Sequence, residues 1–441
     1  MRKVKTLSQL GQIITGKTPP ASCVNSYGET IPFVTPSDMN GLRTISHTDR
    51  MLTEHGLKSV LRALIPAQSV MVSCIGSDMG KVALSKHPCV TNQQINTIIV
   101  ETEDSPLYIY YDLFQRKDQI RNAASGSAQP ILNKSAFSRL EIYLPDPYEQ
   151  RRIAHILGTL DDKIENNRKT AKTLEAMAQA IFKSWFVDFD PVRAKMAGEP
   201  RESICKRLKL TPEILDLFPD RLVDSELGEI PEGWGVGTFG DYADIVGGST
   251  PSTNNPDYWL SGLHSWATPK DLSNLTIPVL LVTENKITDA GLQQISSRLL
   301  PVGTVLLSSR APIGYLAIAE IPVAINQGFI ALKPHNREDN IFLMLLIKHN
   351  MDEIISRANG STFLEVSKAK FRPIPVISPA QAILRFFAKL VIPLFLRIAS
   401  LEKFTRILTI QRDTLLPKLI SGEIRVPEAK YCVEAAMSGE V

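Results

Sequence analysis

The chain has 441 residues, of which 44% are hydrophobic and 22% are charged, and its formal net charge is +3. This composition is typical of globular proteins and excludes a disordered chain, while the length predicts two or three domains of about 100 to 200 residues each. A net charge this small does not by itself indicate nucleic-acid binding, so sequence-specific contacts or a more basic partner would have to supply affinity for DNA.

Cysteine usage and hydropathy exclude further classes of protein. The five cysteines are odd in number and never form a Cys-x-x-Cys pair, so neither a disulfide framework nor a zinc site is indicated. The N-terminus does not lead into an apolar signal segment, and no stretch of 18 apolar residues occurs. We therefore expect a cytoplasmic protein without a membrane span.

The first part of the chain, residues 1–146, shares a pattern with residues 236–379. Residues 4–18 read VKTLSQLGQIITGKT and residues 236–250 read VGTFGDYADIVGGST, so an alternating strand pattern runs into a turn in both. An apolar strand then ends in Thr-Pro-x-Asp twice, and its Asp is predicted to cap the following turn. The loops between these matched motifs differ in length, as loops that face different ligands do. The sequence predicts two similar globular domains.

A long amphipathic helix is predicted after each domain, at residues 147–196 and 380–425. Apolar residues step by 4 and 3 from Ile153 to Trp185, and the same steps recur from Phe387 to Leu419 at a fixed offset (387 − 153 = 234). A helix with one such seam needs a partner, and the other copy supplies it. Asn167, a polar residue in the first seam, is predicted to fix the register. The expected fold class is mixed α+β, with an internal pseudo-twofold repeat and a pair of long antiparallel helices between the domains.

Two segments fall outside the repeat. Residues 197–235 are rich in Glu, Pro and Gly and are predicted to be a linker with one short helix at 211–215. Residues 426–441 are predicted to be a flexible tail.

The search for catalytic chemistry finds only turns and scattered charges. The run from Asn255 to Tyr258 approaches the base-binding loop of adenine methyltransferases, but no Gly-rich cofactor turn precedes it, so an Asx-Pro turn is the better interpretation. The run from Gly76 to Lys81 is one residue short of a phosphate loop and is likewise interpreted as a turn. The acidic pairs at 161–162 and 188–190 are interpreted as solvated charge rather than metal ligands.

The remaining candidates are polar side chains in the loops of both domains, of the types that contact base edges and phosphates. The predicted DNA-binding residues are Lys17, Thr18, Ser37, Asp38, Ser77, Ser127 and Gln129 in the first domain, and Ser249, Thr250, Lys270, Asp271, Ser309, Arg310 and Ser361 in the second. The matched pairs Asn92-Gln93 and Asn326-Gln327 are as well explained by internal backbone hydrogen bonds as by DNA contacts, because they occur in both domains.

Several of these runs resemble a known family. Residues 147–154, 160–167 and especially 180–196 (AIFKSWFVDFDPVRAKM) look like the central conserved region of type I restriction-modification specificity subunits, and residues 413–423 (DTLLPKLISGE) resemble their distal conserved region. The resemblance covers essentially the whole chain. It makes residues 1–146 and 236–379 the two target recognition domains.

The resemblance implies a DNA-recognition subunit without a catalytic site of its own. Each domain would read one half of an asymmetric, interrupted site in double-stranded DNA, while the helices set the gap and dock two methyltransferase subunits. Restriction subunits would join for cleavage, and S-adenosylmethionine, ATP and Mg would be bound by the partners, with no cofactor on this chain. The expected docking residues are Arg151, Arg152, Asp162, Trp185, Phe186, Asp188 and Phe189. Pro393 leaves open whether the second helix is continuous from Gln381.

Three alternatives stay open at this point. The chain could be a DNA adenine methyltransferase, which the missing cofactor motif disfavours. It could be an orphan DNA-binding module of another system. A pure coiled-coil scaffold is disfavoured because two globular domains of about 140 residues are more than a spacer needs.

Overall fold

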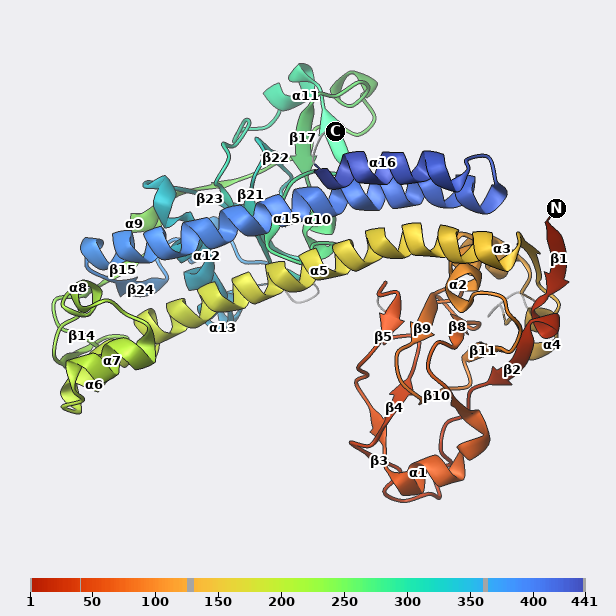
Figure 1. Ribbon diagram of the computed structural model, residues 1–441. Helices are drawn as coiled ribbons and strands as arrows, with labels where there is room; N and C mark the ends of the chain where they lie inside the picture. The colour runs from red at the N-terminus through yellow and green to blue at the C-terminus, as the bar shows by residue number, and fades with distance from the viewer. Residues whose placement is uncertain (1, 40, 125–130, 360–363, 439–441) are drawn as a thin grey trace. The chain divides into compact units, whose positions relative to one another are not determined.

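The computed structural model describes residues 2–39, 41–124, 131–359 and 364–438. The chain divides into two compact units (Figure 1). The first unit comprises residues 1–166 and 405–441, and the second comprises residues 167–404. Each unit therefore contains one globular domain together with one part of each long helix.

The first domain is built on a five-stranded sheet in the order β2-β11-β8-β9-β5. The four long strands pair antiparallel, and β5 joins the edge in parallel to β9. Both faces of the central strands are buried, which explains why β8 reads as an unbroken apolar run rather than an alternating one. The strands are β2 (Gly11–Thr15), β5 (Thr44–Ile45), β8 (Val70–Ser73), β9 (Val82–Ser85) and β11 (Ile95–Val100).

A second sheet, a hairpin-like pair and short helices complete the first domain. The second sheet has the order β3-β6-β4-β10-β7. Strands β1 and β12, from the two ends of the domain's sequence, pair antiparallel. The strands are β1 (Lys3–Thr6), β3 (Tyr27–Gly28), β4 (Ile31–Val34), β6 (Met51–Leu52), β7 (Leu64–Ile65), β10 (Cys89–Thr91) and β12 (Glu141–Leu144). The helices are α1 (Glu54–Ser59), α2 (Pro106–Gln115), α3 (Lys117–Asn122) and α4 (Lys134–Ser138).

The second domain repeats this frame. Its main sheet has the order β16-β23-β20-β21-β18, which matches the first domain strand for strand, and β15 pairs with β24 as β1 pairs with β12. The strands are β15 (Gly235–Thr238), β16 (Ala243–Gly247), β18 (Val279–Leu280), β20 (Val305–Ser309), β21 (Ile313–Ala319), β23 (Phe329–Pro334) and β24 (Pro375–Ser378). The predicted repeat of two similar mixed domains is confirmed.

The smaller sheet of the second domain has three described strands, in the order β19-β17-β22. These strands are β17 (His264–Ala267), β19 (Asn285–Ile287) and β22 (Ala324–Ile325). The helices of the domain are α9 (Phe239–Tyr242), α10 (Pro269–Ser273), α11 (Asp289–Gln293), α12 (Asn340–His349), α13 (Met351–Ser356) and α14 (Lys368–Phe371).

Residues 197–235, predicted to be a linker, are an ordered part of the second unit. They form α7 (Arg201–Leu208), α8 (Pro212–Leu215) and a hairpin of β13 (Leu222–Ser225) and β14 (Gly228–Pro231). Ile204, Phe218 and Ile230 are buried in the same hydrophobic core as the helix and the domain. The predicted short helix is present as α8, with Thr211 as its N-cap and Pro212 in its first turn.

The two long helices are α5 (Pro147–Phe186) and α15 (Gln381–Ser421), drawn in yellow and blue in Figure 1. In the first unit Arg412 Nη1 lies 2.8 Å from Asp161 Oδ1. In the second unit the ring centroids of Phe186 and Phe387 are 5.0 Å apart. From Asp161 to Phe186 along α5, the contacting residue on α15 changes from Arg412 back to Phe387. The two helices are therefore antiparallel, as predicted.

The first long helix is shorter than the predicted 147–196. It ends at Phe186, where the carbonyl oxygen of Lys183 accepts from the amides of Val187 and Asp188 at 3.1 and 2.8 Å. Phe189 then adopts a left-handed conformation with φ of 54°, and α6 (Asp190–Met196) starts in a new direction. The turn brings the side chain of Phe189 into the buried aromatic cluster beside Trp234.

The second long helix runs through Pro393 without interruption. Proline removes one intrahelical hydrogen bond, and the apolar contacts of the surrounding turns, such as those of Val391 and Phe395, hold the helix together. After Gly422, at φ of 80°, the chain reverses into α16 (Val426–Ser438). The predicted flexible tail is therefore helical up to residue 438, with Ala429 and Val433 buried, and residues 439–441 lie outside the described part.

Replacement of Asn167 by leucine is expected to stabilise the protein. Asn167 is only 2% exposed, and its Nδ2 has no hydrogen-bond partner among the described residues. A buried unpaired polar group costs about 1 to 3 kcal/mol, and Leu401 occupies the matching position of the other helix. Asn167→Leu should raise the free energy of unfolding by about 1 kcal/mol, seen as a higher Tm. Asn166→Leu, at the adjacent exposed position, is the control, and a lower Tm for Asn167→Leu would contradict the expectation.

Candidate nucleic-acid interface

The predicted DNA-binding residues of the first domain lie in loops at the ends of its strands, on one side of its main sheet. Antiparallel strands bring the end of one strand beside the start of its neighbour, and backbone hydrogen bonds join the loops there. The amides of Gly16 and Lys17 donate to Ile95 and Thr91 at 3.0 and 2.8 Å, and the amide of Cys74 donates to Gln94 at 2.7 Å. We call this set of loops, residues 16–20, 35–38, 74–81 and 91–94, the first loop edge.

The second domain has the same arrangement, which we call the second loop edge (residues 248–251, 268–271, 309–314 and 325–328). The amide of Ser249 donates to Ile325 at 3.1 Å, and the amide of Ser309 donates to Gly328 at 2.8 Å. The two loop edges therefore bring together most of the residues that the sequence singled out. Ser127, Gln129 and Ser361 lie outside the described residues.

One hydrogen bond recurs at both loop edges. Thr18 Oγ1 donates to Gln93 Oε1 at 2.6 Å, and Thr250 makes the same bond to Gln327. Both glutamines are exposed. The preceding asparagines turn inward: Asn92 Oδ1 accepts the amide of Gln94 at 3.1 Å, and Asn326 does the same for Gly328. For the asparagines, internal hydrogen bonding is the better of the two interpretations.

Asp38 and Asp271 are occupied by the backbone, and this corrects their prediction as DNA contacts. One carboxylate oxygen of Asp38 accepts the amide and hydroxyl of Thr35, both at 2.7 Å, and the other accepts the amide of Asp49 at 2.9 Å. Asp271 repeats the pattern with Thr268. The other expectation, that the shared Asp caps the turn, is confirmed. Carboxylates also repel phosphates, so these hydrogen bonds favour a role in shaping the loop edges over a contact with the DNA backbone.

Removal of either capping carboxylate should cost stability first. Asp38→Ala and Asp271→Ala each remove the acceptor of two backbone amides that are part-buried or exposed, so the free energy of unfolding should fall by about 1 kcal/mol. Asp38→Asn, which retains one acceptor oxygen, should lose less. Thermal unfolding measures the effect. A loss of DNA binding with an unchanged Tm would restore the role as DNA contacts.

The other predicted residues differ in what they offer to a ligand. Lys17, Ser77 and Thr250 are exposed. Lys270 Nζ lies 2.8 Å from Glu284, and Arg310 Nη1 lies 3.5 Å from Glu365. Ser249 and Ser37 are bonded internally, to the carbonyl of Gln294 at 3.3 Å and to the Thr35 hydroxyl at 2.7 Å. Ser309 is 2% exposed, so its prediction as a DNA contact is wrong: strand β20 turns its side chain into the core.

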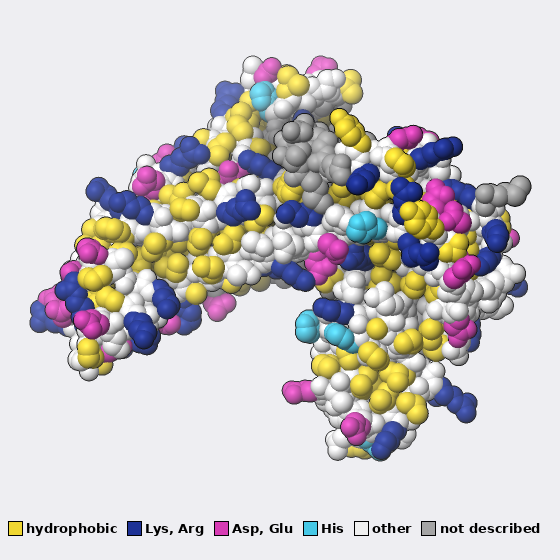
Figure 2. Space-filling view, viewed as in Figure 1, with side chains coloured by type: hydrophobic (Ala, Val, Ile, Leu, Met, Phe, Trp, Pro, Cys, Tyr) yellow, Lys and Arg dark blue, Asp and Glu magenta, His cyan; other side chains and the backbone are white. Residues whose placement is uncertain are grey.

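Two lysines near the loop edges were missed by the sequence reasoning. Lys81 Nζ donates to the carbonyl of Pro36 at 3.2 Å and pairs with Asp78 at 2.9 Å, so it links two loops of the first edge. A Cβ built on Gly247, at the end of β16, would lie 3.2 Å from Lys368 Nζ. Lys368 has a counterpart in the repeat, Lys134, and that coincidence was the available signal. Figure 2 shows Lys and Arg spread among Asp and Glu over the visible face, in keeping with the small net charge.

The loop edges share a frame but carry different groups. The isolated bridge of Ile75 with Ile131 in the first domain matches the bridge of Arg310 with Glu365 in the second. A guanidinium therefore stands where the other domain has an isoleucine. The adjoining loop closes with a hydrogen bond from Met79 to Gly76 at 3.1 Å in the first domain, which confirms the turn predicted there. The turn predicted at Asn255 is also present, as the N-cap of a short 3-10 helix.

The predicted docking residues divide into exposed and buried sets. Arg151 and Arg152 are exposed at the start of α5, and Arg152 lies over the ring of Tyr148 at 5.5 Å. Asp162 is exposed and paired with Arg43, and Asp188 is half-buried and paired with Lys183. Trp185, Phe186 and Phe189 are 2%, 2% and 6% exposed. Their prediction as docking residues is wrong, because they form the core that joins α5 to the second domain.

Other kinds of site are not found in the described part of the chain. No group of three or more His, Cys, Asp or Glu residues there could hold a metal ion. None of the described helices is long and apolar enough to span a membrane. Asp161, predicted to be solvated, is instead 7% exposed and accepts hydrogen bonds from Tyr111 and Arg412.

The comparisons with known proteins agree with one another. The family model for the type I restriction modification DNA specificity domain matches residues 2–176 and 231–392. The specificity subunit of the type I restriction enzyme MjaIX of Methanocaldococcus jannaschii is 28% identical over 437 residues, which cover 96% of this chain and 94% of that protein. The HindI specificity subunit of Haemophilus influenzae is 29% identical over 330 residues, 67% of this chain and 71% of that protein.

The fold also matches a solved structure. The S subunit of a type I restriction-modification system from M. genitalium superposes with a TM-score of 0.57 at 17% identity, and the match covers 95% of this chain and 96% of that one. At this level of identity the likeness is one of fold.

Proposed function

The chain belongs to the type I restriction-modification DNA specificity family and is a non-catalytic specificity subunit, and we propose that its two domains each read one half of an asymmetric, interrupted DNA site. The observation that supports this proposal is the pair of loop edges. They share strand order, turns and the Thr-Gln hydrogen bond, yet they differ in the side chains they present, such as Ile75 and Arg310. A common frame with different readout groups is what two different half-sites require.

The exposed polar groups of each edge are the proposed DNA contacts. Gln93 and Gln327 use their carbonyl oxygens internally, and their amide nitrogens have no partner among the described residues. Such amide nitrogens can donate to acceptors on base edges, such as purine N7, while Lys17 and Arg310 suit phosphate or guanine. Because the net charge is only +3, basic surfaces of partner subunits would add the sequence-independent part of the affinity.

The proposed partners are double-stranded DNA, two methyltransferase subunits and, for cleavage, restriction subunits. The long helices would fix the gap and dock the methyltransferases. The candidates for that contact are the exposed residues Arg151, Arg152 and Asp162 and the half-buried Asp188. S-adenosylmethionine, ATP and Mg would be bound by the partners. The complex would work in the cytoplasm, where its DNA is. Family membership favours this function over a methyltransferase or an unrelated orphan module.

Exchange of one domain tests independent reading. Replacing residues 1–144 with the matching domain of a relative should change one half of the methylated site and leave the other half intact, since each loop edge carries its own contacts. Single-molecule methylome sequencing of cells that express the chain with its methyltransferase subunits gives the site directly. Exchanging residues 236–377 is the matched control and should change the other half. If either exchange alters both halves, the domains do not read independently.

Lengthening both helices tests their role as a spacer. One heptad inserted after Asn167 and another after Thr405 keeps the antiparallel seams in phase and adds about 10 Å, at ~1.5 Å per residue. The gap of the methylated site should grow by about three base pairs, at ~3.4 Å each. The same heptad in α5 alone mismatches the seams and should unfold the pair. An unchanged gap in the double insertion would show that the helices do not measure the DNA.

A further inference from the structure

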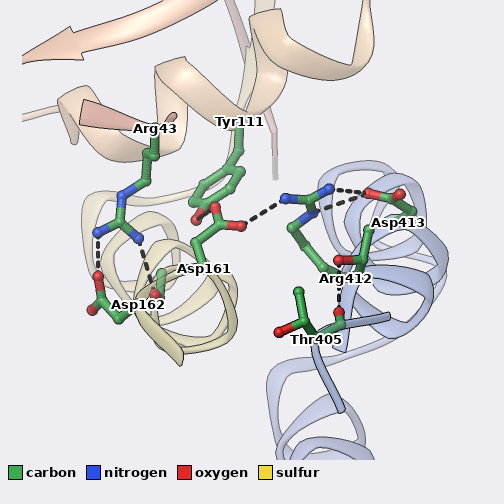
Figure 3. A network of polar contacts seen from close by, with 9 residues as sticks. Arg43, Tyr111, Asp161, Asp162, Thr405, Arg412 and Asp413 are labelled. Atoms are coloured by element: carbon green, nitrogen blue, oxygen red, sulfur yellow. Dashed lines mark hydrogen bonds and ion pairs between the residues drawn. The ribbon is translucent and has the colours of Figure 1, made fainter. Parts of the chain in front are cut away.

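A buried polar network joins the first domain to both long helices (Figure 3). Its centre is Asp161 on α5, which is 7% exposed. Tyr111 on α2 donates its hydroxyl to Asp161 Oδ2 at 2.6 Å, and Arg412 on α15 donates to Asp161 Oδ1 at 2.8 Å. The Asp161 carboxylate thus accepts one hydrogen bond from the domain and one from the other long helix. This single side chain links α2, α5 and α15.

A second contact of the same kind lies one residue along α5. Arg43, in the loop before β5, donates to the carbonyl of Gly158 at 2.9 Å and pairs with Asp162. Burial raises the pKa of Tyr111, and Asp161 raises it further. The hydroxyl therefore stays protonated and remains a donor at neutral pH. Hydrogen bonds to charged groups are both stronger and more directional than apolar contacts.

The second domain builds the same joint without these groups. At the fixed offset, Leu345 stands for Tyr111, Phe395 for Asp161 and Ala178 for Arg412, and all three are buried. Pro278 stands for Arg43, since the carbonyl of each accepts the matching amide of β9 or β21. A cavity of about 440 Å³ lies beside Phe395, lined by apolar residues such as Ile392 and by polar ones such as Glu320 and Arg337. One ion pair also links this domain to α5, between Lys348 Nζ and Glu175 Oε1 at 3.4 Å. The joint can therefore be made without buried charges at its centre, and the fold does not require the network.

A costly feature that the fold does not require calls for another role. Burying Asp161 and Arg412 carries a desolvation penalty that an apolar joint avoids. The charged joint makes the contact directional. Three side chains donate to two adjacent carboxylates and one carbonyl, so only one orientation of the domain on the helices satisfies all of these hydrogen bonds. We propose that Asp161 is a positioning residue, which holds the first domain in one orientation on α5 and α15 and so limits the gap that the subunit accepts between half-sites.

This inference rests on the proposed function, because a gap has meaning only if two half-sites are read together. Asp161 lies outside the loop edge and contacts no proposed DNA-reading group. Loss of the network should leave both half-sequences unchanged. It should let the first domain rock, which brings its loop edge into register with half-sites that are one base pair too near or too far.

The test uses the full chain expressed with its methyltransferase subunits. The substrate is a plasmid set that carries the wild-type half-sequences, found by methylome sequencing, at the native gap and at gaps one base pair shorter and longer. Asp161→Asn keeps the size and removes the charge, and Tyr111→Phe removes only a hydroxyl and so keeps the fold. Both variants should raise methylation at the altered gaps, relative to the native gap, by at least about threefold.

A core variant separates positioning from loss of stability. Met71→Ala opens a cavity between the two sheets of the first domain, on the opposite face of β8 from the joint, and should lower methylation at all gaps in proportion. If Asp161→Asn and Tyr111→Phe behave like Met71→Ala while the wild type remains selective, the positioning role is overturned and the proposed function stands. If the wild type methylates all gaps equally, the helices set no gap, and both proposals fail.

Discussion

The apolar seam of the long helices is the constraint on which the rest of this structure depends. A 40-residue helix with one apolar stripe cannot stay in water alone. The repeat within the chain supplies a partner with the same stripe, and the antiparallel pairing leaves each domain beside one end of each helix. In the second unit the seam and the domain share one continuous hydrophobic core, in which Trp185 and Phe387 of the helices pack with Phe342 of the domain. The helices and the domain of the second unit therefore form one structure.

The features predicted from sequence are those whose signal is local or repeated. The 4 and 3 steps of the seam need only the sequence of one helix, and the matched motifs reveal the second domain. The end of α5 at Phe186 had no such signal, because Phe189 takes a left-handed conformation that usually marks glycine or asparagine. Apolar residues continue at helical spacing up to Met196, so the predicted helix is longer than α5. Pro393 suggested a break that the second helix does not have, because packing around the proline outweighs the one hydrogen bond that it removes.

For the candidate site, the loops at strand ends could be inferred but side-chain direction could not. Loops at strand ends were predicted to hold the readout residues, and the structure brings most of them to one sheet edge. Whether a serine faces solvent or core depends on the register of its strand, and this decides against Ser309. The partners of Asp161 lie 50 and 251 residues away. No pattern within a helix reports on such contacts, which is why Asp161 was interpreted as a solvated charge.

The two halves show how a duplicated fold can keep its geometry while its chemistry changes. Next to Tyr111, Asp112 is buried and paired with Arg116, whereas the matching residue of the second domain is Leu346. Gln150 bonds Asp104 at 2.7 Å, and its counterpart is Leu384. The polar differences thus cluster on the face of the first domain that meets the helices.

Apolar contacts tolerate sliding, because they depend on area more than on angle. Hydrogen-bonded charges do not tolerate it, since each one left unpaired in the interior is destabilising. The first unit carries its charges in paired sets on a frame that the second unit also has, so its joint is directional while the frame is the same.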